Sequence, residues 1–506
     1  MFVKALILML ALCLPSFAEA TTYFADFVAG NDANAGTSTS VPWKRMPGMA
    51  NETTGVTLAS GDLVCLKGGV TWVDVLTPKA RITYASIGGG GLNVLAACVG
   101  WGTGKAVIHV PLSATASGAI IMDGTSDYAI IDGLKVINDD NVNVNTRCAI
   151  YIQGTNGNHL IYPVVQFSEA TLSESGICVT GYTDGFLIWN NDAHDNDTTK
   201  ASCLSTGIFI NGQTATDVNN GIIRHNNLYN NGPSCYDIPL INSNGRGLSF
   251  QTGGTTILVE FNTIYNNGGY PDGVGVDAGG VTEVIFRNNV VSGFETAEIK
   301  ASSNNWKIYG NKFTNTDNQG TFNYGYFITD SIGTTITNNT FISSIASAGW
   351  VVGFTSPGTT TTFANNVLVC QPGHTGPAIV FSQVTGWAQS TWDGHVYNNA
   401  VQGCAKFADV VTSGGSHTLY TLIDYQVAYP QQGQASLFAT NLGVLATYQI
   451  CCDSPIKGAG ALFLPCVDVR GAQCSQPPDL GAYQTTSGGS MILPRLSLTQ
   501  PRAARH

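Results

Sequence analysis

Charged side chains are scarce in this chain of 506 residues. Asp, Glu, Lys and Arg together make up 11% of it, against about 25% in an average globular protein. The 22 basic residues form no stripe, and the formal net charge is −11, so the surface repels the phosphate backbone of nucleic acids. We therefore expect no nucleic-acid partner. An anionic ligand would need a local basic group or a bound cation.

Several catalytic and membrane signatures are missing as well. The sequence contains no phosphate-binding glycine loop, no nucleophile elbow around a serine and no zinc-protease helix. No Cys-x-x-Cys pair with a nearby histidine completes a tetrahedral zinc site. Beyond the first 20 residues, no apolar run approaches the roughly 18 residues of a membrane span. We expect a soluble protein without a transmembrane anchor.

The first 20 residues have the pattern of a secretory signal peptide. Lys4 precedes an apolar run from Ala5 to Leu14, and Ala18-Glu19-Ala20 supplies small residues at the cleavage spacing. We expect cleavage after Ala20 and a protein that is secreted or periplasmic. Removal of the signal leaves 12 of the 13 cysteines, an even number that favours disulfides in an oxidising compartment. Bridging is expected above all where four cysteines crowd the C-terminal end, at Cys451, Cys452, Cys466 and Cys474.

A segment of the form apolar-x-apolar-x-Asn-x-apolar recurs along the chain. Its asparagines lie 22 to 36 residues apart, an irregular period typical of a solenoid whose loops vary in length. We interpret them as a structural ladder formed by stacked turns. The aligned residues are Asn191, Asn227, Asn262, Asn289, Asn311, Asn339, Asn366 and Asn399.

Each repeat also contains an earlier strand of the form Gly-apolar-x-apolar-polar, as at Gly176, Gly207, Gly247 and Gly273. Every repeat thus holds three short strands, and their alternation buries one face. Because one repeat cannot bury its apolar side alone, the copies must stack in parallel. The pattern predicts an all-β fold, a single-stranded right-handed parallel β-helix with three strands per coil. A set of antiparallel sandwiches is the alternative.

Both ends of the mature chain resemble a known group of proteins. The stretches YFADFVAGNDANAGTSTSVPWK (23–44) and GDLVCLKGGVTW (61–72) resemble the opening of secreted pectate-lyase-like β-helix proteins. The stretches SPIKGAG (454–460) and PDLGAYQ (478–484) resemble their closing segment. The resemblance covers most of residues 21–484 and implies the same fold. It leaves the reaction open, because this superfamily hosts lyases, hydrolases, epimerases and binding proteins.

These patterns divide the chain into five parts. A signal peptide (1–20) is followed by an N-terminal cap with the first coils (21–110) and by the parallel β-helix (111–450). A Cys-rich closing segment (451–484) and a polar tail without a repeat (485–506) complete the chain. We expect the tail to be disordered and the protein to be a monomer.

Stacking brings distant residues together, because equivalent places on neighbouring repeats lie about 4.8 Å apart. At the fifth place of the Gly-led strand, Asp277 and Lys300 fall at matching phases, with Glu298 on the same face. Arg246 and Asp272, each just before its strand, also match. In a chain so poor in charge this cluster predicts a functional site. The alternative is a surface ion pair between Asp277 and Lys300.

A second outward row precedes the asparagines. We expect it to be a solvated charge ladder, the alternative being an acid/base site made of His225, Glu260 and Arg287. The row reads Trp189, His225, Glu260, Arg287, Tyr309 and Thr337.

The first cluster suits β-elimination from a uronic-acid polymer, in which a base removes the proton next to a neutralised carboxylate. Several pectate-lyase-like families combine acidic calcium ligands with a Lys or Arg base on this sheet. The resemblance implies Lys300 as the base and Arg246 as a substrate clamp. It also implies a calcium cofactor. The calcium ligands would be Asp272, Asp277 and Glu298.

The resemblance to individual lyase families is partial. The stretch EIKASSN (298–304) resembles the lysine segment of alginate and chondroitin lyases of this fold. Their following Arg-His-Gly motif is absent about one coil later, where TFNYGYF (321–327) stands. Tyr324, Tyr326 and Trp350 are expected to stack on sugar rings near the groove.

A polysaccharide lyase is the function that the sequence favours. A glycoside hydrolase of the same architecture is the second interpretation, since Asp272, Asp277 and Glu298 could supply its carboxylates across a cleft. A non-catalytic glycan-binding or surface protein is the third.

Overall fold

The computed structural model describes the chain from residue 20 to residue 439, with gaps. Of β24, β27 and β30 it describes the backbone alone. The predicted closing segment and tail, and all but the last residue of the predicted signal peptide, lie outside the described residues. The described residues are 20–91, 97–111, 116–139, 148–196, 205–212, 214, 217–232, 245–267, 274–278, 280–292, 296–299, 304–315, 326–329, 333–343, 350–355, 361–384, 395–397, 399–412, 416–429 and 436–439.

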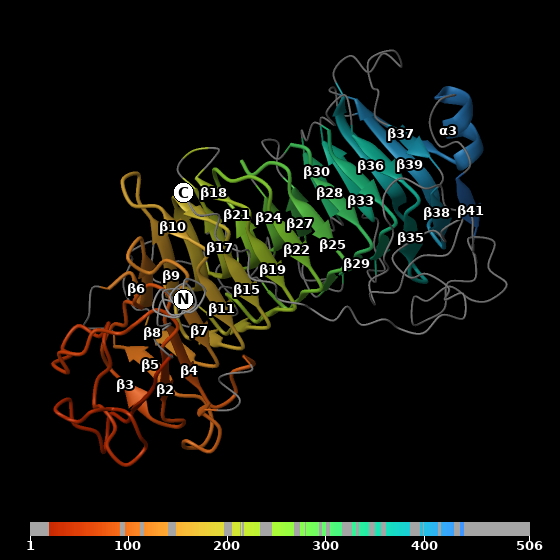
Figure 1. Ribbon diagram of the computed structural model, residues 1–506. Coiled ribbons are helices and arrows are strands. Elements are labelled where there is room, and N and C mark those ends of the chain that lie inside the picture. Colours follow the sequence, from red (N-terminus) through yellow and green to blue (C-terminus); the bar gives the residue numbers. More distant parts are fainter. Residues whose placement is uncertain are drawn as a thin grey trace, which may run out of the picture.

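Three long sheets run side by side along an elongated stack of windings (Figure 1). In each winding the chain passes through sheet I, then sheet II, then sheet III, and returns to sheet I one level further along. Equivalent strands of successive windings pair in parallel, as β13 pairs with β17 and β15 with β19. The predicted all-β, right-handed parallel β-helix with three strands per coil is confirmed.

Sheet I has 12 strands, and all its pairings are parallel except the last, between β39 and β40. In spatial order its strands are β6 (Gly118–Asp123), β9 (Cys148–Gly154), β13 (Ser175–Gly181), β17 (Thr206–Asn211), β21 (Arg246–Phe250), β24 (Val274–Ala278), β27 (Thr296–Ile299), β30 (Tyr326–Thr329), β33 (Val352–Thr355), β36 (Pro377–Val384), β39 (Lys406–Thr412) and β40 (His417–Tyr420).

Sheet II has 13 strands and begins at the first strand of the chain. Its strands are β1 (Thr22–Ala25), β2 (Leu63–Leu66), β4 (Thr83–Ser86), β7 (Ile130–Asp132), β11 (Val164–Gln166), β15 (Leu187–Trp189), β19 (Ile222–Arg224), β22 (Leu258–Glu260), β25 (Ile285–Arg287), β28 (Lys307–Tyr309), β31 (Thr335–Thr337), β34 (Thr362–Ala364) and β37 (His395–Tyr397).

Sheet III also has 13 strands, and a three-stranded sheet lies between sheets I and II in chain order. Sheet III holds β3 (Thr71–Trp72), β5 (Val107–Val110), β8 (Lys135–Asn138), β12 (Glu169–Thr171), β16 (Asp192–His194), β20 (Asn227–Tyr229), β23 (Thr263–Tyr265), β26 (Val290–Ser292), β29 (Lys312–Asn315), β32 (Thr340–Ser343), β35 (Val367–Cys370), β38 (Ala400–Gln402) and β41 (Leu437–Ala439). The small sheet holds β10 (Leu160–Ile161), β14 (Thr183–Asp184) and β18 (Val218–Asn219).

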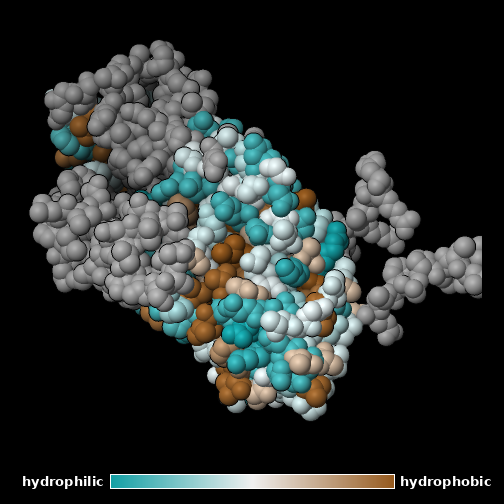
Figure 2. All heavy atoms as spheres, turned by 90° about the vertical axis from the view of Figure 1, so that its left-hand side faces the viewer, coloured by the Kyte–Doolittle hydropathy of each residue, from teal (hydrophilic) through white to brown (hydrophobic). Residues whose placement is uncertain are grey.

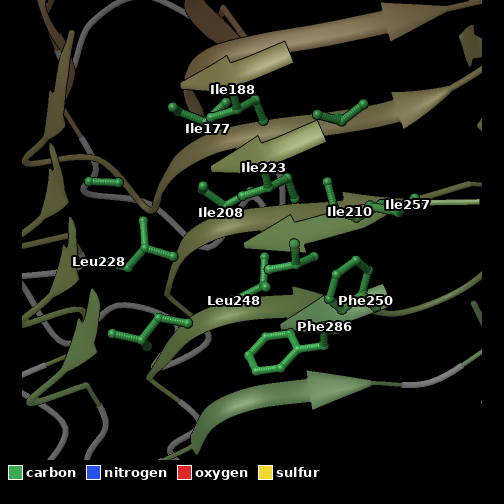
Figure 3. Close-up of a cluster of buried hydrophobic side chains, with 14 of the residues drawn as sticks. Ile177, Ile188, Ile208, Ile210, Ile223, Leu228, Leu248, Phe250, Ile257 and Phe286 are labelled. Atoms are coloured by element: carbon green, nitrogen blue, oxygen red, sulfur yellow. The ribbon is translucent and has the colours of Figure 1, made fainter. Parts of the chain in front are cut away.

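The core is a column of stacked apolar side chains between the three sheets. Ile177, Ile208 and Leu248 succeed one another from sheet I, while Ile188 and Ile223 face them from sheet II (Figure 3). All five are fully buried. Fully burying such a side chain is worth about 1.5–3 kcal/mol, so this column explains why parallel stacking is stable in a chain with few charges.

The asparagine ladder sits at the corner between sheets II and III. Each buried asparagine side chain accepts a hydrogen bond from the backbone of the preceding winding and donates to a backbone carbonyl. Asn191 N thus donates to Asn226 Oδ1 at 2.9 Å, and Asn226 Nδ2 donates to Ile188 O at 3.0 Å. The ladder satisfies backbone groups that a buried turn would otherwise leave unpaired.

One rung of the predicted ladder was wrong, because Asn226 and not Asn227 occupies it. His225 adopts the left-handed turn conformation with φ 55°, as Asn190 does one winding earlier with φ 54°. The next residue, Asn226, therefore points inward, and Asn227 begins β20 with an exposed side chain. The sequence places three polar residues together here, and only the turn geometry decides which of them faces the core.

A second ladder, which the sequence pattern did not indicate, follows sheet III. Asn196 Nδ2 donates to Asn231 Oδ1 at 2.7 Å, and Asn231 Nδ2 donates to Asn267 Oδ1 at 2.8 Å. Both corners of sheet III are therefore fixed by buried amides in this part of the helix.

Among the described residues, three disulfides join neighbouring windings, Cys65–Cys98, Cys148–Cys178 and Cys370–Cys404. They confirm that disulfides form, while the cysteines of the predicted closing segment lie outside the described residues. An α-helix, α3 (Leu422–Ala428), lies at the C-terminal end of the described part of the β-helix (Figure 1). It brings the fully buried Tyr425 against Phe381 and Phe407.

Candidate functional site

One outward row of sheet I contains two of the predicted charged residues, Asp277 and Glu298. Strand pairing fixes the row, because each member is the Cα partner of the next. Its described positions are Ile121, Tyr151, Cys178, Phe209, Ser249, Asp277, Glu298, Phe327, Gly353, Val380 and Asp409.

The pairing corrects the predicted phase of Asp277. Asp277 is the partner of Glu298, whereas the repeat pattern in the sequence predicts Lys300 as its partner. The motif Gly-Val-Gly-Val contains two glycines, and Gly275, not Gly273, corresponds to Gly247 in the β21–β24 register. The two acidic residues are therefore direct neighbours on successive windings. Lys300, one residue beyond β27, lies outside the described residues.

Arg246 begins β21 next to this row. Its side chain is 7% exposed, and Nη1 donates to Ser249 Oγ at 3.3 Å. Ser249 is in turn the Cα partner of Asp277, so the guanidinium lies beside the strand position that precedes the two acidic residues. The predicted match between Arg246 and Asp272 is wrong, because Arg246 pairs with Val274. Asp272 itself lies outside the described residues.

Trp350 lies along the same row. Its indole covers Gly353, where an added Cβ would come within 2.5 Å of Nε1. Gly353 pairs with Phe327, and Phe327 pairs with Glu298, so the indole sits two windings beyond the acidic pair. The glycine has a clear role here, because any side chain would displace the ring.

The two predicted tyrosines are less well placed by the structure. Tyr326 pairs with Val352 of the next winding, and Val352 is fully buried. The strand position of Tyr326 therefore belongs to a core-facing row and not to the outward row of Asp277 and Glu298. Tyr324 lies outside the described residues.

The predicted second row exists on sheet II, with one substitution. Arg224, not His225, pairs with Trp189 and Glu260, because His225 occupies the corner and stacks on Phe261 at 5.1 Å. Burial lowers the pKa of His225, and the neighbouring Arg224 lowers it further.

The charges of this row form an ion ladder around Glu260. Arg287 donates to Glu260 Oε2 from Nε at 2.8 Å and from Nη2 at 2.6 Å, and Nη1 donates to Tyr309 Oη at 3.1 Å. Burial would lower the pKa of Arg287, but the hydrogen bonds with Tyr309 and Glu260 outweigh it and raise the pKa. The expected charge ladder is thus present, although Glu260 is buried and not solvated.

A third charged cluster, which sequence reasoning missed, lies on sheet III. Lys135 Nζ donates to Glu169 Oε1 at 2.6 Å. His194 approaches the same oxygen to 3.4 Å through Nε2, and its Nδ1 lies 2.7 Å from Asp195 Oδ2. The ring of Tyr229 stacks on His194 at 4.6 Å. Lys135 and Glu169 are Cα partners at one outward position of sheet III, and His194 and Tyr229 are partners two residues further along the strand, so only the strand register brings the four together.

Mutual contacts shift the protonation of this cluster. The hydrogen bond with His194, and those with Lys135, lower the pKa of Glu169 to about 2 against the effect of burial. Burial opposes the protonation of His194, but its contacts with Glu169 and Asp195 outweigh burial and raise its pKa. Below the raised pKa of His194 the cluster is a network of opposite charges that satisfy one another.

The described side chains include no group of three or more His, Cys, Asp or Glu that could hold a metal ion. Among the predicted calcium ligands, Asp272 lies outside the described residues, and Asp277 and Glu298 belong to strands described by their backbone.

Within the described residues, no helix is long and apolar enough to cross a membrane. Hydrophilic residues cover much of the face seen in Figure 2, with smaller hydrophobic patches between them.

No protein-family model and no curated protein matches the chain. Solved structures share its fold. A structure of XylC in complex with xylose has 10% sequence identity and a TM-score of 0.53, covering 92% of this chain and 98% of the other. The pectate lyase Pel9A has 13% identity and a TM-score of 0.45, with 93% and 98% covered. The A-module of the mannuronan C-5 epimerase AlgE4 from Azotobacter vinelandii has 13% identity and a TM-score of 0.42, with 75% and 88% covered. At these identities the likeness concerns the fold, and at that level the resemblance to pectate-lyase-like β-helix proteins is confirmed.

Proposed function

We propose that this protein is an exported enzyme that cleaves an acidic polysaccharide by β-elimination on the outer face of sheet I. The observation that carries the proposal is the pairing of Asp277 with Glu298, with Arg246 and Ser249 one winding earlier. In a chain with 11% charged residues, two acidic residues paired on one row, with a guanidinium beside that row one winding earlier, concentrate the chemistry that a uronate polymer requires.

The reaction removes the proton on C5 of a uronate and expels the oxygen on C4. The C5–H and C4–O bonds break, a C4=C5 double bond forms, and the leaving oxygen takes up a proton. The adjacent carboxylate must be neutralised for C5 to be acidic enough, a role that the Arg246 guanidinium supports by charge. Lys300 accepts the proton, since a cationic neighbour lowers a lysine's pKa and frees its amine as a base.

Calcium fits the acidic pair in spacing. Asp277 and Glu298 are Cα partners, hence about 4.8 Å apart between strands. Side chains on strands at that spacing can reach one calcium ion together, whose oxygen ligands lie at about 2.3–2.6 Å. Asp272 is the third ligand in this proposal. A bound calcium ion would neutralise the substrate carboxylate as a Lewis acid.

Binding of the polymer along the row would follow from the aromatic groups. The Trp350 indole, two windings beyond Glu298, offers a ring on which a sugar can stack. Tyr324 is a second candidate for the same role, whereas Tyr326 holds a strand position whose partner in the next winding, Val352, is buried. Three disulfides between windings suit an oxidising compartment and support a secreted or periplasmic location.

The test is a screen of purified protein on pectate, alginate and glycosaminoglycans, with calcium and with chelator. We expect an unsaturated product that absorbs in the ultraviolet, lost with chelator and in Lys300→Ala. Lys307→Ala is the matched control, because Lys307 is an exposed lysine on sheet II, and it should keep full activity. An unchanged rate in Lys300→Ala would refute the assigned base, and the absence of unsaturated product from all substrates would refute the lyase.

Glycoside hydrolysis is the second candidate, favoured by the likeness in fold to XylC, whose structure was determined with xylose. The carboxylates of Asp272, Asp277 and Glu298 would then be the acid, base or nucleophile. Xylan belongs in the same screen, and new reducing ends without ultraviolet absorbance would identify this reaction. Binding without any cleavage would identify a glycan-binding protein.

A further inference from the structure

Arg224 on sheet II has more hydrogen-bond donors than the described part of the chain satisfies. A guanidinium carries five N–H donors in a planar fork. Nη2 lies 3.5 Å from Glu260 Oε1, and Nε is buried without a hydrogen-bond partner. The side chain is 17% exposed. A buried Nε without an acceptor is costly, and the accessible remainder of the guanidinium is where a ligand can bind.

The charges around Arg224 do not cancel. Glu260 is held through Oε2 by two hydrogen bonds from Arg287, so one carboxylate faces two guanidinium groups. The remaining positive charge lies on Arg224, in a chain whose net charge is −11. An anionic group is therefore the ligand that completes the site, and the fork of Arg224 matches a carboxylate in two-point geometry.

The surroundings of Arg224 suit a sugar ring. Trp189 is its Cα partner on the preceding winding, and Phe167 contacts the indole edge to face at 4.9 Å. Ile222 and Leu187, at the other outward positions of the same two strands, are half-buried. The apolar face of a sugar ring can pack on such groups while its carboxylate reaches the guanidinium.

We propose that Trp189, Arg224 and Glu260 form a binding site on sheet II for a sugar unit that carries a carboxylate. Arg224 takes the carboxylate, Trp189 packs against the ring, and the buried Glu260, held by Arg287, orients the Arg224 guanidinium. The inference rests on the proposed function for the class of polymer, a uronate polysaccharide. It places a second contact with that polymer on a different sheet from the acidic pair. This second site would anchor the polysaccharide and would not cleave it.

The experiment is isothermal titration calorimetry in an Arg246→Met background, which weakens the sheet I site. The probes are the trisaccharides of galacturonate, mannuronate and guluronate, each paired with its methyl ester, which differs by lacking the charge. We expect at least one acid to bind and its ester to bind at least tenfold more weakly. Adding Arg224→Met should abolish that preference, whereas Lys307→Met, an exposed lysine on the same sheet, should leave it unchanged.

Three results would overturn the proposal: no binding of any acid trisaccharide, equal binding of acid and ester, or an acid preference that survives Arg224→Met. Trp189→Leu is a second variant that leaves the ion ladder intact, and it should weaken acid and ester alike. The readout is separate from cleavage. Selective binding with no unsaturated product would refute the lyase alone, and cleavage without Arg224-dependent selectivity would refute this site alone.

Discussion

Asp277 and Glu298 are paired residues on successive windings of sheet I. Like charges placed directly opposite on neighbouring strands repel each other, so this pair costs stability unless a cation lies between the two carboxylates. A surface with so few charges had many other places for them. Under the proposed function a calcium ion between the two carboxylates removes this cost, and the effect of calcium on the protein is then measurable without any substrate.

Calcium should stabilise the wild-type protein, and Glu298→Gln should lose that effect. A ligand present at 100 times its dissociation constant adds about 2.7 kcal/mol to the free energy of unfolding. Thermal unfolding in calcium and in chelator measures the difference as a shift of the midpoint. Glu283→Gln is the control, because Glu283 is an exposed glutamate at a corner of the helix that contacts Thr255 and Thr256. If calcium raised the unfolding midpoint of both variants equally, Asp277 and Glu298 would not be the calcium site.

The cluster of Lys135, Glu169, His194 and Asp195 should make stability depend on pH in two windows. The pKa of Glu169 is lowered to about 2 in the folded state, so its contribution is complete above its unfolded pKa and is lost as the pH falls from about 4.3 towards 2. The pKa of His194 is raised, so its contribution is complete below about 6.5 and is lost as the pH rises through the folded value.

Chemical denaturation of the wild type and of His194→Gln across this pH range tests both signs. The wild type should exceed the variant by about 1–2 kcal/mol near pH 5, and the difference should shrink at alkaline pH. Tyr229, which stacks on His194, stays neutral throughout, because burial and nearby acids raise its pKa to about 12. A difference that grows with pH would contradict the assigned contacts.

The sequence was sufficient for the parallel β-helix because its evidence is periodic. Each repeat must bury its apolar row on the next, and inward asparagines such as Asn262 and Asn289 recur with the strands. What the periodicity leaves open is register within a repeat. A shift of two residues keeps the same face outward, so the alternation could not decide whether Asp277 lies opposite Lys300 or Glu298.

The corner residues set a second limit. A left-handed turn conformation is read from the sequence when Asn or Gly occupies it, as at Asn190. At His225 and Phe261 the same conformation holds bulky side chains, which no local preference predicts. Both register errors, at Asn226 and at Arg224, follow from that one turn. The contacts around Glu169 join residues of neighbouring windings, so they become visible only when the register between those windings is known.

Asn226 and Asn227 give a matched pair for testing the ladder. Asn226→Ala removes the acceptor of the Asn191 amide and the donor to Ile188 O, all in buried surroundings. The cost should be about 2–4 kcal/mol, because each buried group left unpaired costs about 1–3 kcal/mol. Asn227→Ala loses one exposed contact, to Asp192, and should change stability by less than about 0.5 kcal/mol.

Hydrogen exchange gives the local measurement for this pair. The Asn191 amide should exchange faster in Asn226→Ala and at the wild-type rate in Asn227→Ala. Equal losses of stability in the two variants would contradict the assignment of the rung to Asn226, and a larger loss in Asn227→Ala would place it at Asn227.

Two buried tyrosines should respond in opposite ways to loss of their hydroxyl. Tyr425, under the cap helix α3, is fully buried, and its hydroxyl makes no hydrogen bond in the described part of the chain. Tyr84 donates to Pro47 O at 2.7 Å and accepts from Lys79 N at 3.2 Å. Burying an unpaired hydroxyl costs about 1–3 kcal/mol, whereas a satisfied one contributes about 1 kcal/mol.

Tyr425→Phe should therefore leave the protein as stable as before or more stable, by up to about 2 kcal/mol. Tyr84→Phe should destabilise it by about 1–2 kcal/mol, because the Pro47 carbonyl then loses its donor. Denaturant unfolding, followed by the fluorescence of the chain's eight tryptophans, compares the two variants under one set of conditions. Both keep the aromatic ring, so packing against Phe381 and Phe407 is unchanged in the cap, and the sign of each effect reports on the hydroxyl alone. A loss of stability in Tyr425→Phe as large as that in Tyr84→Phe would mean that the Tyr425 hydroxyl has a partner in the folded protein.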